Sequence, residues 1–355
     1  MAKPCIKVAS MDVSCDTHAW KVKEKHGEEY GFEQRFGVQF DEIEKQEADV
    51  VNLQEIRFPE NLEIIKERKG EKYNVHHFYN NKDGMSFHSL ICVRKDIHCE
   101  WKDISSKHYW TTIDKNTRKP MLSSDPNARV EKNESENIKG DPHGRCVGVV
   151  VLEHKKTSKK LLIASVHVVP FGQTKAAQQM ASLSLANMAC DITGEDCPVI
   201  LAGDFNIFND EREDGTFQLI NKYAKSLSLR EIPLKKMTIP DMDDVIDPEQ
   251  IGTFNPWSTD TNAEMVYKQP LGYSKLDAIF ASTSLECKDG VTVYPVLMRK
   301  GKGASMDLND PSKMSDEDKK THTKLRYMFK DKLASDHFLL TAKFTFKIES
   351  AIEKK

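Results

Sequence analysis

Short apolar runs that end in polar residues recur along the chain and predict buried strands. The clearest run covers residues 198–202 and leads into Gly203-Asp204-Phe205-Asn206. Gly203 allows the chain to turn sharply where it leaves the sheet. Further runs that predict strands cover residues 5–13, 49–56, 89–94, 146–152, 161–167, 275–282 and 341–346.

Segments with helical spacing of apolar residues lie between these runs. Phe36, Phe40 and Ile43 are spaced as on one face of an amphipathic helix. The predicted helices cover residues 34–48, 60–68, 174–190 and 212–229. The alternation of strands and helices indicates an α/β or mixed sandwich built in layers.

Two long segments interrupt this alternation. Residues 107–145 lose apolar periodicity and predict a long surface connection. Residues 298–333 contain ten lysines and arginines and six acidic residues, a net charge of about +4. This charged segment either contacts phosphate groups or is a solvated loop. We expect a single domain over residues 1–355 with surface insertions near these two segments, although the length also permits two domains.

Composition narrows the function classes. A net charge of −3 excludes a basic field over the whole protein, which marks many nucleic-acid binders. A partner that carries phosphate groups must therefore bind to local basic patches. No apolar stretch approaches the length of a membrane span, and the first residues lack an apolar signal core. The eight cysteines include no Cys-x-x-Cys pair, which favours reduced thiols. We therefore expect a cytoplasmic protein, and nothing in the sequence predicts its oligomeric state.

Asp204 and Asn206 follow the clearest strand and are two residues apart. In extended backbone they would project to the same side, a carboxylate beside a carboxamide. Such a pair suits a hydrolytic site, where one group takes a proton from water and the other fixes water or phosphate. The alternative is an Asx turn that caps the next segment.

Other predicted strands also end in polar residues. The set comprises Asp12, Glu55, His167, Asp204, Asn206, Asp277, Asp336 and His337. Carboxylates that meet at one sheet edge repel one another unless a cation neutralises them. Oxygen ligands of this kind suit Mg²⁺ or Mn²⁺. Taken singly, Glu55 could instead be a salt-bridged strand end, His167 a core histidine and Asp336 a helix N-cap.

Five short motifs in order resemble the endonuclease/exonuclease/phosphatase superfamily, which has the deoxyribonuclease-I-like fold. They are Leu53-Gln54-Glu55, Ser165-Val166-His167, Gly203-Asp204-Phe205-Asn206, Leu276-Asp277-Ala278-Ile279-Phe280 and Ser335-Asp336-His337. The resemblance covers nearly the whole chain. It implies a four-layer α/β/β/α sandwich of two packed mixed sheets, a divalent metal at their common edge, and hydrolysis of a phosphate ester.

The resemblance also implies a role for each matching residue. Glu55 would ligate the metal, with Asp336 helping directly or through water. Asp204 would activate the attacking water, and Asn206 would hold that water or the phosphate. His337, oriented by Asp277, would stabilise charge on the phosphoryl oxygens. His167 would bind the phosphate.

Two positions are less defined by the resemblance. The first strand of the family usually ends in Asn, whereas this chain has Asp12, which would add a negative charge beside the metal. Asp12 could also be an ordinary strand-end residue. Arg145 is similar to a family arginine that approaches substrate phosphate, or it is a surface residue at a strand start.

The sequence discriminates only partly between phosphate esters. The Trp-x-Gly-Asp-x-Asn and Pro-Ala-Trp-Cys-Asp-Arg motifs of inositol-polyphosphate 5-phosphatases are absent, as is the Trp-Asn of abasic-site endonucleases. We predict a Mg²⁺-dependent (or Mn²⁺-dependent) phosphodiesterase that acts on nucleic acid or a nucleotide-like substrate. The alternatives are a phosphomonoesterase, a sphingomyelinase-like enzyme, and a catalytically silent binding module on the same fold.

Overall fold

A computed structural model describes most of the chain, with gaps between the described segments. These segments are residues 3–13, 31–57, 59–79, 88–96, 99–114, 116–117, 119–125, 145–169, 174–208, 211–212, 215–238, 275–294, 335 and 337–347. Of the motifs above, Asp336 lies outside the described residues, and so does the whole 298–333 segment.

Two mixed β-sheets form the centre of the structure. The first has the strand order β11-β14-β15-β1-β2-β4-β3, with β13 paired to β15. Its strands are β1 (Cys5–Asp12), β2 (Val50–Ile56), β3 (Tyr73–Phe78), β4 (His88–Arg94), β11 (Leu234–Met237), β13 (Leu285–Glu286), β14 (Val291–Tyr294) and β15 (Leu339–Phe346). The parallel strands β1 and β2 lie at its centre and end at the same edge.

The second sheet has the order β10-β12-β9-β8-β7-β5-β6. Its strands are β5 (Trp101–Ile113), β6 (Pro120–Ser123), β7 (Cys146–His154), β8 (Lys160–His167), β9 (Val199–Asp204), β10 (Leu229–Glu231) and β12 (Asp277–Ser282). Its central strands β8 and β9 are also parallel. Strands β1 and β2 pack across the sandwich against β9 and β8.

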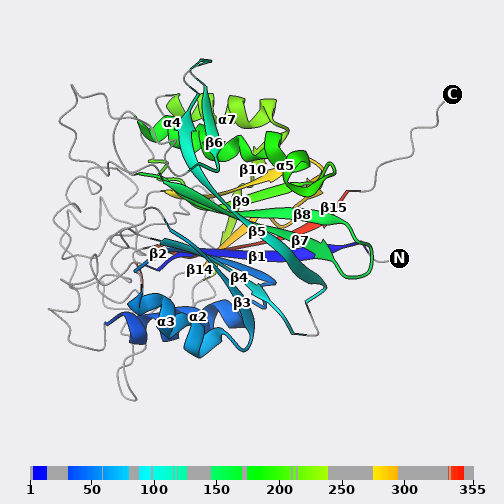
Figure 1. Cartoon of the computed structure of the whole chain (residues 1–355). Helices are drawn as coiled ribbons and strands as arrows, with labels where there is room; N and C mark the ends of the chain where they lie inside the picture. Colours follow the sequence, from blue (N-terminus) through cyan, green and yellow to red (C-terminus); the bar gives the residue numbers. More distant parts are fainter. Residues whose placement is uncertain are drawn as a thin grey trace.

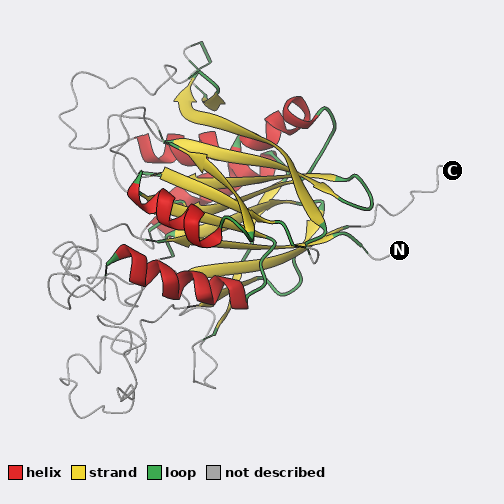
Figure 2. Cartoon of the chain, turned by 60° about the horizontal axis from the view of Figure 1, so that its bottom comes forward, coloured by secondary structure: helices red, strands yellow, loops and turns green. Residues whose placement is uncertain are grey.

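Helices cover the outer faces of both sheets (Figures 1 and 2). Helices α2 (Phe32–Lys45) and α3 (Glu60–Lys69) lie on the first sheet, and α4 (Thr174–Leu183), α5 (Leu185–Thr193) and α7 (Thr216–Ser226) lie on the second. Three apolar layers result: one between the sheets and one under each helical layer. The four-layer α/β/β/α sandwich predicted from the sequence is confirmed.

Alternation along the strands explains how each sheet serves two cores. In β1, Ile6 and Val8 point into the layer between the sheets, while Ala9 and Met11 face α2 and α3. In β8, Ile163 enters the central layer, and its neighbours enter the layer under α5 and α7. Because successive side chains point to opposite faces, a strand that is buried on both sides reads as a continuous apolar run.

The helical layers rest on the periodic apolar residues noted in the sequence. Phe32, Phe36 and Phe40 form a row along α2 with ring centroids 5.4 Å and 5.0 Å apart. Burying a side chain of this size contributes about 1.5–3 kcal/mol. None of the described helices has the length and apolar character needed to cross a bilayer.

The helix predicted over residues 174–190 is two helices. Helix α4 ends at Leu183, and α5 begins at Leu185. Ser182 Oγ donates to Gln178 O (2.8 Å), and Ser184 Oγ donates to Ala181 O (2.7 Å). Serine hydroxyls that bond to the preceding turn in this way bend helices, and the apolar pattern conceals the break.

Strands β5 and β6 occupy part of the segment predicted to be a surface connection. Residues 107–113 continue β5, and residues 120–123 form β6 at the edge of the second sheet. The middle of β5 is exposed and polar, and its buried end includes Thr111 and Thr112, so no apolar run marks the strand. The prediction of a loop was therefore wrong for these two stretches, and residues 126–144 lie outside the described chain.

Candidate functional site

Three predicted site residues lie side by side at one edge of the second sheet. Asp204, at the end of β9, pairs in register with His167 at the end of β8 and with Asp277 at the start of β12. All three are buried. Because β8 and β9 are parallel and β12 is antiparallel to β9, these ends meet at one edge.

Asp12 and Glu55 approach the same place from the first sheet. Asp12 is the last residue of β1, and Glu55 is the next-to-last residue of β2. Glu55 Oε1 lies 3.9 Å from His167 Nε2, and His167 Nε2 lies 3.8 Å from Asp204 Oδ2. The two sheets therefore bring residues from β1, β2, β8 and β9 together.

Glu55 adopts an unusual backbone conformation. Its φ of 59° lies in the left-handed region, and the pairing of β2 with β4 is irregular between Leu53 and Ile56. A bulge of this kind re-aims a side chain that the regular alternation would point elsewhere. A left-handed residue other than glycine costs about 1–3 kcal/mol and persists where the surroundings fix it, most often at functional sites.

The end of β9 requires glycine at position 203. Gly203 has a φ of 150°, and a Cβ built on it would lie 2.0 Å from Val166 O of β8. No side chain fits into that space. The close approach of the two strands places Asp204 beside His167.

Asp204 and Asn206 form one hydrogen-bonded unit. Asn206 N donates to Asp204 Oδ1 (2.7 Å), and Asn206 Nδ2 donates to Asp204 Oδ2 (2.6 Å) and to Val168 O (2.7 Å). The Asx turn considered from the sequence is present, with Asn206 at a φ of 51°. The turn and the carboxylate–carboxamide pair are therefore the same structure, because the bonds that cap the turn also orient Asp204.

His337 pairs with Asp277 at the same edge. Its Nδ1 lies 2.9 Å from Asp277 Oδ2, and both side chains are buried. Ser335 Oγ donates to Asp12 O (2.8 Å) and accepts from His337 N (3.1 Å). Ser335 thus ties the His337 segment to the end of β1.

The carboxylates dominate the electrostatics. The pKa of Asp204 is raised to about 7, because burial, Asp277 and Glu55 together outweigh the lowering by His337 and the Asn206 backbone amide. Burial alone would lower the pKa of His337, but Asp277, Asp12 and Asp204 raise it well above its usual 6.5. The site therefore favours a protonated His337 facing a carboxylate that exchanges its proton near neutral pH.

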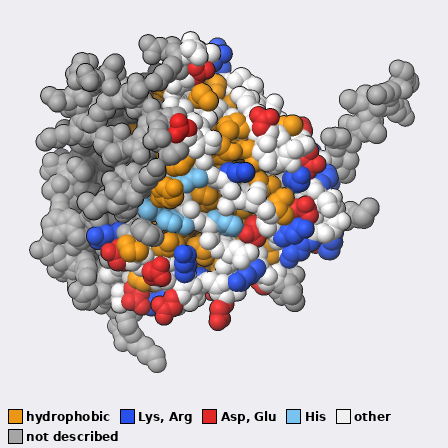
Figure 3. All heavy atoms as spheres, in the orientation of Figure 1, with side chains coloured by type: hydrophobic (Ala, Val, Ile, Leu, Met, Phe, Trp, Pro, Cys, Tyr) orange, Lys and Arg blue, Asp and Glu red, His pale blue; other side chains and the backbone are white. Residues whose placement is uncertain are grey.

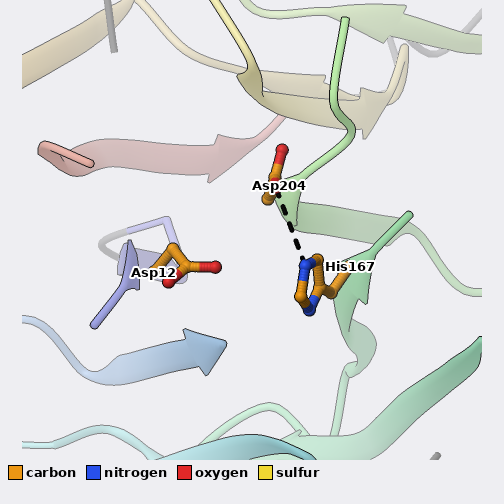
Figure 4. Close-up of side chains that lie close together, drawn as sticks. All are labelled: Asp12, His167 and Asp204. Carbon is orange, nitrogen blue, oxygen red and sulfur yellow. Dashed lines mark ion pairs between the residues drawn. The ribbon is translucent and has the colours of Figure 1, made fainter. Parts of the chain in front are cut away.

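Three of these residues form a possible metal-binding cluster. Ligand atoms of Asp12, His167 and Asp204 all lie within 4.8 Å of one another. In Figure 4 the three side chains point from β1, β8 and β9 into a common space. Two buried carboxylates with Glu55 close by are a donor set that suits a divalent cation. This cluster includes His167 and Asp204, for which the family resemblance implies other roles.

Arg145 is buried directly before β7, so it is not a surface residue. Its carbonyl accepts bonds from Thr111 N (3.0 Å) and Thr111 Oγ1 (3.1 Å), which fixes this point of the chain to β5. Arg145 neighbours Cys146, which is paired with Trp110 of β5.

Sequence reasoning missed several residues that hold the site. Asn52 Nδ2 of β2 donates across the sandwich to Ala164 O (2.8 Å), and Gln54 Nε2 donates to Ser165 Oγ (2.9 Å). The sequence contains a signal for these residues, because Asn52 and Gln54 interrupt the apolar run of β2 at alternate positions. Gln179 of α4 also donates to Phe205 O (2.8 Å), beside Asp204.

Comparison with known proteins adds structural similarity only. No family model matches the chain, and no curated protein matches it in sequence. An endonuclease/exonuclease/phosphatase family protein from Bacteroides thetaiotaomicron is similar over 98% of this chain and 97% of its own, with 17% identity and a TM-score of 0.61.

Two further solved structures share the fold. A mannosyl-6-phosphatase from Bacteroides thetaiotaomicron VPI-5482 has 17% identity over 96% of this chain and 100% of its own, with a TM-score of 0.55. ANGEL2, a 2′,3′-cyclic phosphatase in complex with adenosine-2′,3′-vanadate, has 14% identity over 97% of this chain and 96% of its own, with a TM-score of 0.57. The chain thus has the fold of endonuclease/exonuclease/phosphatase proteins.

Proposed function

We propose that the chain is a divalent-metal-dependent phosphoesterase of the endonuclease/exonuclease/phosphatase superfamily. The observation that carries this proposal is the buried convergence of Asp12, Glu55, His167, Asp204 and the Asp277–His337 pair at one edge of two sheets. Buried carboxylates at this density are costly without a compensating cation. The shared fold supports the assignment.

Glu55 and Asp12 would hold the cation, and Asp336 is expected to assist them. A bound Mg²⁺ or Mn²⁺ supplies Lewis-acid stabilisation of a phosphoryl group. The position of Asp12 favours a metal-binding role, because its ligand atom lies within 4.8 Å of those of His167 and Asp204.

The remaining residues have roles in an in-line attack by water. Asp204 takes a proton from the attacking water, and its pKa of about 7 is close to the value that suits a general base at neutral pH. Asn206 fixes the carboxylate and the water. The water oxygen forms the new bond to phosphorus while the bond to the leaving oxygen breaks.

Protonated His337 donates a hydrogen bond to the phosphoryl oxygens as negative charge accumulates on them. Asp277 orients this imidazole by accepting from Nδ1, which leaves Nε2 for the substrate. His167 and Arg145 would contact the phosphate, as the family resemblance implies.

We further propose a phosphodiester in nucleic acid or a nucleotide-like molecule as the substrate. The adenosine-based ligand of ANGEL2, which has the same fold, supports a nucleotide-like substrate. The mannosyl-6-phosphatase has the same fold, so a sugar phosphomonoester is the competing substrate class.

A substrate panel tests this choice. The protein with Mg²⁺ at fixed low salt is assayed on single-stranded RNA, single-stranded and duplex DNA, bis-p-nitrophenyl phosphate, mannose 6-phosphate, inositol phosphates and sphingomyelin. We expect hydrolysis of bis-p-nitrophenyl phosphate and of at least one nucleic acid. Hydrolysis of a sugar phosphate, an inositol phosphate or sphingomyelin, with none of the nucleic acids cleaved, would refute the substrate class.

A further inference from the structure

Five ring-bearing residues form a second cluster next to the candidate site. The aromatic–imidazole cluster consists of His77 of β3, Tyr79 just after β3, His88 of β4, and His108 and Trp110 of β5. None of these residues has a role in the reaction proposed above. Strands from both sheets contribute to the cluster.

The rings form two stacks that Tyr79 joins. His77 stacks on His88 with centroids 4.8 Å apart and planes 15° apart. His108 stacks on Trp110 at 4.2 Å and 16°. The Tyr79 ring meets His108 edge-on at 4.6 Å and lies 6.3 Å from Trp110.

Each stack has a buried inner ring and a partly exposed outer ring. His88 is 1% exposed and Trp110 is 5% exposed, whereas His77, His108 and Tyr79 are only partly buried. In Figure 3 histidine side chains gather beside hydrophobic ones on the visible face. The outer rings are therefore held in fixed orientations by the rings beneath them.

The cluster adjoins the strand positions next to Glu55 and Arg145. His88 pairs with Ile56, the residue after Glu55, and Trp110 pairs with Cys146, the residue after Arg145. Adjacent strands are about 4.8 Å apart, so the cluster is one or two strand spacings from those two residues. A ligand the size of one nucleotide can reach both places.

The cluster is uncharged at neutral pH. The pKa values of His77, His88 and His108 are lowered to about 4 each, chiefly by burial. Neutral rings stack well on other flat rings and attract no free phosphate. The neutral rings of the cluster thus complement the charged groups of the candidate site.

Two ring nitrogens in the cluster have no hydrogen-bond partner among the described residues. Trp110 Nε1 and His108 Nε2 are enclosed, and no described residue bonds to either. Buried polar atoms in proteins are nearly always hydrogen-bonded, so two unsatisfied ring nitrogens side by side are unusual. A partner with acceptor atoms in or on its ring would satisfy them.

We infer that the aromatic–imidazole cluster is a subsite for the nucleobase of the substrate, which stacks there while its phosphate occupies the carboxylate edge. The inference rests on the proposed function and specifies it. Base stacking on side-chain rings tolerates different bases, so the subsite selects nucleotides over other phosphates without strong base preference.

Direct binding measurements test the subsite independently of catalysis. Isothermal titration with the full chain compares adenosine 5′-monophosphate, ribose 5-phosphate and mannose 6-phosphate in the presence of Mg²⁺. We expect the adenosine nucleotide to bind about 10-fold more tightly than ribose 5-phosphate. The variants His108→Ala and Tyr79→Leu should reduce this preference to below about twofold.

A matched control and a second measurement keep the test decisive. His76→Ala removes an imidazole from the same strand outside the cluster, where it pairs with Asp103, and should retain the preference. If the cluster variants fail to fold, transferred nuclear Overhauser effects in the unaltered protein should connect adenine H2 or H8 to imidazole or indole protons. Their absence would overturn the subsite.

The outcomes separate the two proposals. Equal binding of the three phosphates, or tighter binding of mannose 6-phosphate, refutes the nucleobase subsite even when diesters are hydrolysed. An adenine preference that depends on His108, in a protein that hydrolyses no phosphate ester, supports the subsite and refutes only the enzymatic proposal.

Discussion

Buried histidines in two neighbouring regions have opposite properties. His337 lies among Asp277, Asp12 and Asp204, and these carboxylates raise its pKa despite burial. His88 lies among rings, and burial lowers its pKa to about 4. The residue type and the burial are the same, so the neighbouring groups decide the charge. One region is organised for ions and the other for neutral rings.

The largest expected effect is loss of the proposed base in the charged region. Asp204→Asn keeps the shape of the side chain but cannot take a proton, so kcat for bis-p-nitrophenyl phosphate should fall about 10³-fold. Asp103→Asn is the control, because Asp103 also pairs with a histidine but lies outside the site. Equal rates for Asp204→Asn and the parent would contradict the assignment of this residue.

The second prediction concerns the protonated imidazole. His337→Gln should lower kcat about 10²-fold with a smaller change in KM, since the imidazolium acts mainly on charge that develops during the reaction. His76→Gln breaks a histidine–carboxylate pair outside the site, between His76 and Asp103, and should leave kcat unchanged. A similar loss in both variants would show that His337 has only a structural role.

The third prediction concerns the close approach of β8 and β9. Gly203→Ala should lower the free energy of unfolding by about 3 kcal/mol, because the added Cβ meets Val166 O. Gly194→Ala is the matched control: its φ is also positive, but no atom lies within 4 Å, so about 1 kcal/mol is expected. Urea denaturation of both variants measures the difference, and equal losses would refute the steric explanation.

The smallest expected effect is a pH dependence of stability with opposite signs in the two regions. The cluster histidines have folded-state pKa values below the ordinary 6.5. As the pH falls from about 6.5 to about 4, these histidines become protonated in the unfolded chain but stay neutral in the folded protein, so the free energy of unfolding decreases. His337 has a raised folded-state pKa, so it contributes stability below pH 6.5 that is lost as the pH rises through its folded-state value.

Urea titrations from pH 4 to pH 9 measure both trends. His88→Phe should weaken the acid-side loss, and His337→Gln should weaken the alkaline-side loss. If His88→Phe leaves the acid limb as steep as in the parent, the cluster histidines are not the groups responsible.

Much of the charged region could be predicted from the sequence. Asp12, His167 and Asp204 end apolar runs, and the ends of parallel strands in one sheet meet at one edge. The order of the runs and the family motifs were enough to predict the sandwich. Local patterns were informative here because strand ends are defined by sequence itself.

Features that depend on tertiary contacts were not predictable in this way. The left-handed backbone of Glu55 arises where β2 pairs irregularly with β4, and the burial of Arg145 depends on the packing around β5 and β7. The aromatic–imidazole cluster gathers residues from three strands in two sheets. None of its members ends an apolar run next to a recognisable motif.

The most direct test of the central claim is the metal dependence of diester hydrolysis by the unaltered protein. Hydrolysis of bis-p-nitrophenyl phosphate is measured after treatment with EDTA and again after Mg²⁺ or Mn²⁺ is restored in excess. The convergence of Asp12, Glu55 and Asp204 predicts that activity disappears with EDTA and returns with the cation. Undiminished hydrolysis in EDTA, or none under any condition, would contradict a metal-dependent phosphoesterase.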